Sequence, residues 1–202
     1  MWRVGASTVR ADAARDPAAA GSRRQDLALA RAAALGDREA FEQVVRLHGP
    51  AMLRYARRVL HDPGDAEEAV QDALVAAWRS LERYRGDSAL RTWLLGLTSH
   101  KALDLARRRR PRPQQEEVLL ARPAGAGSDP WDHASAADLA RALEGALGGL
   151  PYRQRACWLL VEVEGLTQAE TAEVLGTGPD VVRGQLSRAR RALEERMATW
   201  RP

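Results

Sequence analysis

The part of the sequence that decides the fold runs from Gly165 to Arg196 and reads GLTQAETAEVLGTGPDVVRGQLSRARRALEER. It opens with the residues TQAE at 167–170, whose first and last members have the spacing of a capping box at a helix N-terminus. The apolar residues after them predict a short helix that ends near Leu175. A Gly-Thr-Gly turn follows, and Pro179 then begins a long helix directed toward Trp200.

Two helices joined in this way form a helix-turn-helix when small and apolar residues stand where the helices cross. Ala172, Gly176 and Val182 occupy these positions. An ordinary helical hairpin would show the same pattern, so the charge on the second helix has to distinguish the two. The residues of that helix that suit the major groove of DNA and its phosphates are Asp180, Arg183, Gly184, Ser187 and Arg188. We therefore predict a DNA-binding motif.

The composition is that of a globular protein. The chain has 202 residues, 45% of them hydrophobic and 29% charged, with a net charge of +4, and this excludes a wholly disordered or collagen-like chain. The longest uncharged apolar run, residues 156–161, is far shorter than the roughly 20 residues of a membrane-spanning helix. The single cysteine, Cys157, excludes an intramolecular disulfide framework and fits a reducing cytoplasm.

Helical periodicity runs through the rest of the chain, and no stretch alternates as a β-strand does, so the fold class is predicted to be all-α. We expect two small helical domains joined by an extended linker, the second domain containing the helix-turn-helix. The expected boundaries are 1–24 for a disordered tail, 25–110 for the first domain, 111–135 for the linker and 136–202 for the second domain.

An acidic face is predicted on a helix from residue 66 to about 84, with Asp65 as its N-cap and Trp78 on the core side. Glu68 and Asp72 could hold a metal ion, but one helix seldom supplies a closed site and no histidine stands beside them. A solvated surface is another interpretation, and a protein-docking face is the one we favour. The residues of this face are Asp65, Glu68, Gln71, Asp72 and Val75.

A second candidate site surrounds the turn at 85–88. Aromatic and basic residues there could stack unpaired bases and hold backbone phosphates. Core packing is the alternative for Trp93, since aromatic residues at helical spacing usually pack inside. The residues of this site are Arg85, Gly86, Asp87, Ser88, Arg91, Trp93 and Lys101.

A family resemblance joins these features. The segments DAEEAVQDALVAAW (65–78), LERYRGDSALRTWLLGL (81–97) and LDLARRRR (103–110) resemble, in order, region 2 of the extracytoplasmic-function sigma factors of bacterial RNA polymerase. The segment from Leu150 to Arg196 is similar to region 4 of the same family. The occurrence of both in this order is more specific than either alone.

The resemblance implies a factor without enzymatic activity or cofactor that binds core RNA polymerase, directs it to promoters and promotes DNA melting. The implied partners are core polymerase, through its beta-prime coiled coil and beta flap, promoter DNA, and an anti-sigma factor. The face from Asp65 to Trp78 would dock on polymerase. The turn at 85–88 with Arg91, Trp93 and Lys101 would capture an extruded base of the minus-ten element, and Asp180, Arg183 and Ser187 would meet the minus-thirty-five element.

Some positions depart from the family pattern. Gly96, Ser99 and His100 stand where members often have arginine or asparagine, and Gly178 replaces the usual serine cap. Two other functions remain open from the residues alone. One is a free-standing helix-turn-helix regulator, which would need no acidic docking face. The other is a metal-dependent nuclease that uses Glu68 and Asp72.

Overall fold

The computed structural model describes residues 17–108 and 136–198, and every regular element within these ranges is helical. The all-α prediction is therefore confirmed. The elements are α2 (Pro17–Ala34), α3 (Arg38–Leu60), α4 (Pro63–Ser80), η1 (Leu81–Arg83), α5 (Leu90–Arg108), α6 (Ala136–Gly148), α7 (Tyr152–Trp158), the π-helical turn η2 (Leu159–Val163), α8 (Gln168–Val174) and α9 (Pro179–Arg196).

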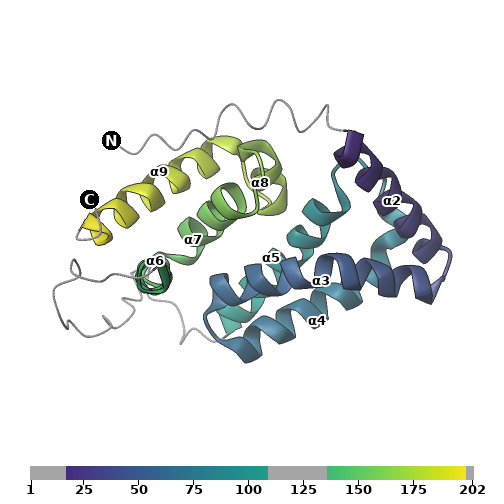
Figure 1. Ribbon diagram of the computed structural model, residues 1–202, viewed down its shortest axis with the longest axis horizontal. Helices are drawn as coiled ribbons and strands as arrows, with labels where there is room; N and C mark the ends of the chain where they lie inside the picture. The colour runs from purple at the N-terminus through teal and green to yellow at the C-terminus, as the bar shows by residue number, and fades with distance from the viewer. Residues whose placement is uncertain (1–16, 109–135, 199–202) are drawn as a thin grey trace.

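Helices α2 to α5, with η1, form an N-terminal unit in which α3, α4 and α5 pack side by side and α2 covers one end (Figure 1). Its core includes Met52, Leu90 and Leu94, each 1% exposed. Local sequence sets the ends of α3. The Asp37 side chain accepts a hydrogen bond from the Ala40 amide at 3.1 Å, as an N-cap does, and His61 ends the helix in the left-handed conformation.

Helices α6 to α9, with η2, form a C-terminal unit that contains the predicted helix-turn-helix. The Thr167 hydroxyl accepts from the Glu170 amide while the Glu170 carboxylate accepts from the Thr167 amide, so the capping box is present. Ala172 and Val182 are buried together with Cys157, and Gly176 makes the turn with φ at +59°. The helix crossing that the sequence predicted is thus confirmed.

The two units share one hydrophobic cluster. Tyr55 and Leu95 of the N-terminal unit are buried in the same cluster as Leu160, Leu166 and Val174 of the C-terminal unit. Helix α8 packs on the middle of α5, where a β-carbon at Gly96 would lie 3.9 Å from Val174 (Figure 1). The sequence predicted two separate domains and gave no sign of this contact, because none of the local patterns reaches across the intervening segment.

The structure bears on the predicted limits of the tail and of the second domain. Helix α2 begins at Pro17, so residues 17–24 of the expected tail are helical. Residues 1–16 and the expected linker at 111–135 lie outside the described residues. The second domain was expected from residue 136, which is where α6 begins.

Two side chains differ from their expected places. Asp62, not Asp65, caps α4, accepting a hydrogen bond from the Asp65 amide at 2.8 Å, because Pro63 occupies the first helical position. Asp65 therefore falls inside the first turn and is only 5% exposed, which removes it from the exposed acidic face. Trp78 was expected in the core but is 37% exposed, with one edge against Phe41 and their ring centroids 5.0 Å apart.

Candidate functional site

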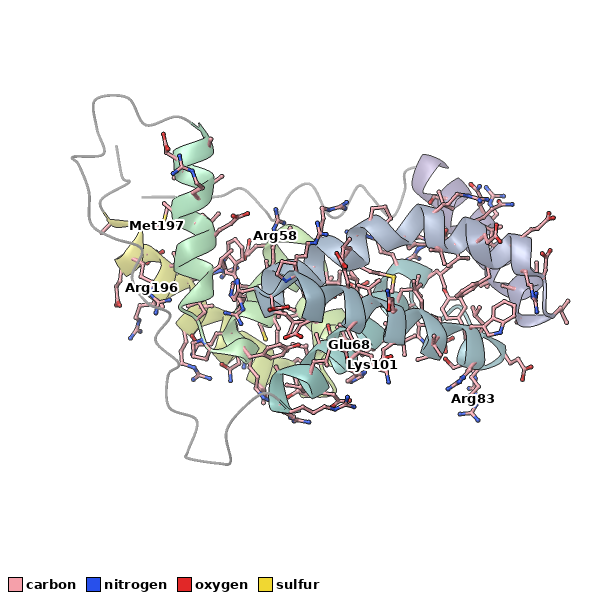
Figure 2. The ribbon with its side chains drawn as sticks, turned by 90° about the horizontal axis from the view of Figure 1, so that it is seen from below. Arg58, Glu68, Arg83, Lys101, Arg196 and Met197 are labelled. Carbon is pink, nitrogen blue, oxygen red and sulfur yellow. The ribbon has the colours of Figure 1, made fainter. Side chains whose placement is uncertain are left out.

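The exposed side of α4 places carboxylates beside an apolar strip. Glu68, Gln71 and Asp72 are exposed, and Val75 and Trp78 continue the same side with 48% and 37% of their surfaces exposed. Spacings of three and four bring these residues onto one helix face. Figure 2 shows Glu68 near the middle of the N-terminal unit, well away from Arg83 at its end. A negatively charged face with uncovered apolar surface suits a basic protein partner.

The turn at 85–88 is held closed by the residues that flank it. The Tyr84 hydroxyl donates to the Ser88 carbonyl oxygen at 2.7 Å, and its ring lies 5.2 Å from the Trp93 ring. Trp93 is half-buried, so it belongs partly to the core, as the alternative interpretation allowed. Arg85, Gly86 and Asp87 are exposed and Ser88 is half-buried, so the turn presents charged and polar groups to solvent.

Two cations of this site lie on α5, and they differ in their surroundings. Lys101, which is labelled in Figure 2, is half-buried. Arg91 instead reaches the C-terminal unit, where Nη1 donates to the Glu164 carbonyl oxygen at 2.9 Å and Nη2 contacts the Glu164 carboxylate. In this arrangement Arg91 is therefore engaged by protein and is not turned toward a nucleic acid.

The helix-turn-helix presents its predicted residues at the start of α9. Asp180 and Arg183 form an exposed ion pair at 2.6 Å, which orients the guanidinium across the first turn. Ser187 and Arg188 are exposed one turn further, and Gly184 is half-buried between these turns. These residues, from Asp180 to Arg188, form a row along α9 that can enter a major groove. Its arginines can donate to base edges or to phosphates.

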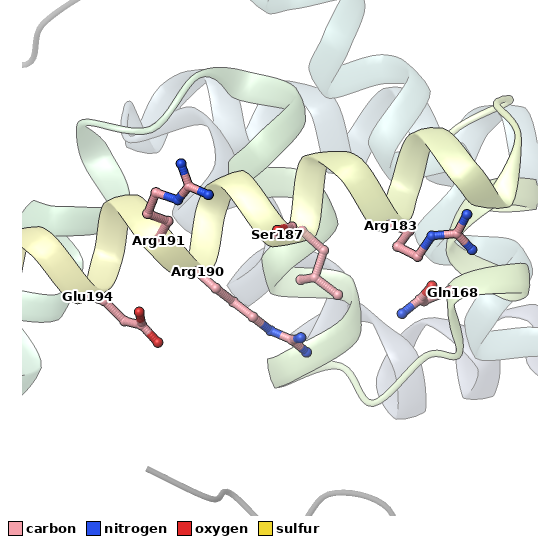
Figure 3. Close-up of a pocket in the computed structure, with 7 residues that line it drawn as sticks. Gln168, Arg183, Ser187, Arg190, Arg191 and Glu194 are labelled. Atoms are coloured by element: carbon pink, nitrogen blue, oxygen red, sulfur yellow. The ribbon is translucent and has the colours of Figure 1, made fainter. Parts of the chain in front are cut away.

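A groove of about 340 Å³ runs along this row. Figure 3 shows Gln168 of α8 facing Arg183, with Ser187 and Arg190 farther along α9. Arg190 is paired with Glu162 of η2 at 2.6 Å. The lining residues are Gln168, Arg183, Leu186, Ser187, Arg190, Arg191 and Glu194.

The predicted DNA-binding set contains Arg183 and Ser187 but not the other residues that line the groove, which are Gln168, Leu186, Arg190, Arg191 and Glu194. The spacing from Ser187 through Arg190 to Glu194 follows one helix face and could have revealed Glu194. Gln168 comes from the preceding helix, so only the crossing of the two helices brings it to the groove. Local periodicity carries no signal for such a position.

Within residues 17–108 and 136–198, no group of three or more His, Cys, Asp and Glu side chains is arranged to hold a metal ion. Among the helices in these ranges, none is both long and apolar enough to cross a bilayer.

Comparison with known proteins identifies the class. Residues 44–112 match the family model of Sigma-70 region 2, and residues 140–193 match that of Sigma-70 region 4. The ECF RNA polymerase sigma factor SigM of Mycobacterium tuberculosis is 33% identical over 172 residues, covering 84% of this chain and 83% of its own. RNA polymerase sigma factor CnrH of Cupriavidus metallidurans is 35% identical over 176 residues, covering 83% of this chain and 92% of its own.

Solved structures agree. CnrH in complex with the cytosolic domain of CnrY superposes with a TM-score of 0.62 at 32% identity, covering 85% of this chain and 96% of that one. The sigma factor RpoE in complex with the anti-sigma factor NepR from Bartonella quintana gives a TM-score of 0.60 at 25% identity, covering 80% and 98%. The chain belongs to the extracytoplasmic-function sigma factors, which are RNA polymerase-binding, promoter-specific initiation factors.

Proposed function

We propose that three surfaces of this sigma factor divide the work of initiation. The exposed side of α4 docks on core RNA polymerase, the turn at 85–88 with neighbouring α5 residues captures an unpaired base of the minus-ten element, and the start of α9 reads the minus-thirty-five element. The observation that carries this assignment is that one chain presents both an acidic, partly apolar helix face and an exposed arginine row on a helix-turn-helix.

The docking step rests on Glu68, Gln71, Asp72 and Val75, all of them exposed on α4. The carboxylates of Glu68 and Asp72 attract a basic partner. The apolar strip, Val75 with Trp78, adds buried area on contact. A coiled coil of the beta-prime subunit supplies such a partner, and the beta flap is the counterpart for the C-terminal unit. A free-standing regulator would have no use for this face.

The strand-capture step rests on the turn at 85–88, on Trp93 and Lys101, and on Arg91. The tied turn offers polar groups for an extruded base, and the cations hold the phosphates beside it. Extrusion costs a few kcal/mol per base, which stacking and a fitted pocket offset. Arg91 is bonded to Glu164 here, so its own part in strand capture requires that this contact be broken.

The protein acts without catalysing a reaction of its own, in the cytoplasm, where bacterial polymerase works. Two solved relatives were captured with CnrY and with the anti-sigma factor NepR. By analogy, an anti-sigma factor is the third class of partner for this chain.

Run-off transcription tests the proposal. Purified core polymerase is incubated with and without the full chain on a library of genomic fragments from the source organism. We expect new transcripts that start at defined positions only when both proteins are present. Binding of duplex DNA by the chain alone, with no stimulation of polymerase, would favour the free-standing regulator instead.

A further inference from the structure

One flank of α2 borders the turn at 85–88. Leu27 of α2 packs against Gly86 of that turn. The short helix η1, which leads into the turn, also packs against α2. Figure 2 shows Arg83 of η1 at the end of the N-terminal unit that α2 covers. The flank of α2 that carries Leu27 therefore lies beside the surface to which strand capture is assigned.

The arginines of α2 gather on this same flank. At about 100° per residue, Arg23, Arg24 and Arg31 fall within an arc of about 100° around Leu27. All three arginines are exposed. Between residues 21 and 34, the opposite flank of the helix carries only uncharged residues. The positive charge of α2 is thus concentrated on the side that meets the turn.

The one acidic residue of α2 does not offset this charge at the surface. Asp26 is 9% exposed, and its Oδ1 lies 3.1 Å from Nε2 of His48 in α3. This contact anchors α2 on α3 and helps to fix the rotation of the helix about its own axis. The exposed charge that α2 itself carries is therefore wholly positive.

The turn lies within the field of these charges. Burial and the Asp26 charge raise the pKa of Tyr84, and the Arg23 guanidinium opposes this, so Arg23 is within electrostatic reach of the Tyr84 hydroxyl. That hydroxyl donates to the Ser88 carbonyl oxygen, and the Tyr84 ring packs on Trp93. Cations beside an aromatic pair form the combination that binds unpaired nucleic acid.

We propose that α2 is part of the surface that binds the melted strand, and that Arg23 and Arg31 bind backbone phosphates next to the base captured by the turn. The two arginines stand one helical turn to either side of Leu27 and about 12 Å apart along the helix, so they contact different phosphates. Arginine suits this role because its guanidinium forms two parallel hydrogen bonds with a phosphate. The inference rests on the proposed function of the turn, and α2 precedes the residues that match region 2.

Neutral phosphates test the contact. Core polymerase carrying the full chain is bound to a promoter template that comes from the run-off experiment and is melted in advance. Uncharged methylphosphonate linkages replace the phosphates of the melted strands, one position at a time. The variants are Arg23→Gln and Arg31→Gln. Arg46→Gln is the matched control, because Arg46 is exposed on α3 and pairs with Glu42 at 3.7 Å. Helicity and urea unfolding are measured for each protein.

We expect each of the two α2 variants to lower affinity for the unmodified template about two- to fivefold, whereas Arg46→Gln binds like the parent. The slope of log affinity against log salt should become shallower by about 0.7 for each arginine removed. A methylphosphonate that weakens the parent should have no further effect on the variant that lacks the contacting arginine. Parent-like affinity of both α2 variants, or a loss that leaves every linkage as sensitive as in the parent, would overturn the proposal. An equal loss on fully paired duplex would overturn it too, because the contact would then be to duplex phosphates.

Abasic sites separate this inference from the proposed function. An abasic site removes a base and keeps its phosphate, so it weakens binding wherever a base is captured. Methylphosphonate effects that depend on Arg23 or Arg31, with no effect of any abasic site, would contradict base capture by the turn and leave the α2 contact supported. Sensitivity to an abasic site in the parent, with both α2 variants indistinguishable from it, would support base capture and refute the α2 contact.

Discussion

Leu27 of α2 lies directly against Gly86 in the turn at 85–88, so closely that a β-carbon at Gly86 would stand 3.1 Å from Leu27 Cδ1. Gly86 also has φ at +82°, a conformation that L-residues with side chains rarely adopt. The shape of the turn thus depends on a residue without a side chain and on a helix from outside the region 2 match, which begins at residue 44.

Gly86→Ala should distort the turn. Positive φ costs an alanine about 1–2 kcal/mol, and contact with Leu27 adds to this. We expect lower transcription on duplex templates, with partial recovery on a template melted in advance. Gly145→Ala on α6 is the matched control, because a β-carbon there meets nothing within 4 Å. Equal losses on both templates would argue against a role of the turn in strand capture.

Asp72→Arg tests the docking face. Reversing the charge adds repulsion to the loss of attraction, so we expect binding to core polymerase to weaken by tenfold or more, about 1.4 kcal/mol or above. Co-purification with core polymerase measures this, with Glu42→Arg on the exposed side of α3 as the control for charge reversal elsewhere. A folded Asp72→Arg protein that co-purifies like the parent would remove α4 from the docking surface.

Arg183→Ala distinguishes base reading from phosphate contact. A guanidinium with two hydrogen bonds to a base would contribute about 1–3 kcal/mol on a selected promoter and little on scrambled duplex. A phosphate contact would lower affinity on both duplexes and make the salt dependence shallower. Polymerase holoenzyme binding at two salt concentrations decides between them. Asp180→Ala should not reproduce the loss of duplex affinity, since it removes the ion pair with Arg183 but leaves the guanidinium in place.

Local sequence was sufficient to predict the helix-turn-helix. The capping box from Thr167 to Glu170 and the crossing of Ala172 with Val182 depend on residues close together in the chain, and both were predicted. Short-range rules apply here because each interaction spans one or two helical turns.

The errors arose where two local rules compete or where partners are distant. Asp62 and Asp65 both suit a cap, and the preference of proline for the first helical position decides for Asp62. Arg91 and Glu164 are 73 residues apart, and no periodicity records their contact. No sequence pattern singled out Arg155, which is buried and donates to the Val59 carbonyl oxygen of the other unit.

Thr167→Ala tests the cap of the first helix of the motif. The substitution leaves the Glu170 amide without its side-chain partner and should lower the free energy of unfolding by about 1 kcal/mol. Urea denaturation measures this directly, and promoter affinity should fall as α8 frays. Thr177→Ala in the following turn, half-buried and outside the capping box, is the control. An unchanged urea midpoint would show that the capping box contributes nothing to stability.

His61 should make stability depend on pH. Partial burial and the nearby Arg155 charge lower the pKa of His61 from 6.5 to about 4. Between these values the unfolded chain binds more protons than the folded chain, so this contribution to stability is constant above about pH 6.5 and is lost as pH falls toward 4. His61→Asn tolerates the left-handed conformation, with φ at 63°, and cannot titrate. Urea unfolding of both proteins at pH 7, 6 and 5 should show a shallower decline for the variant, and parallel declines would contradict the prediction.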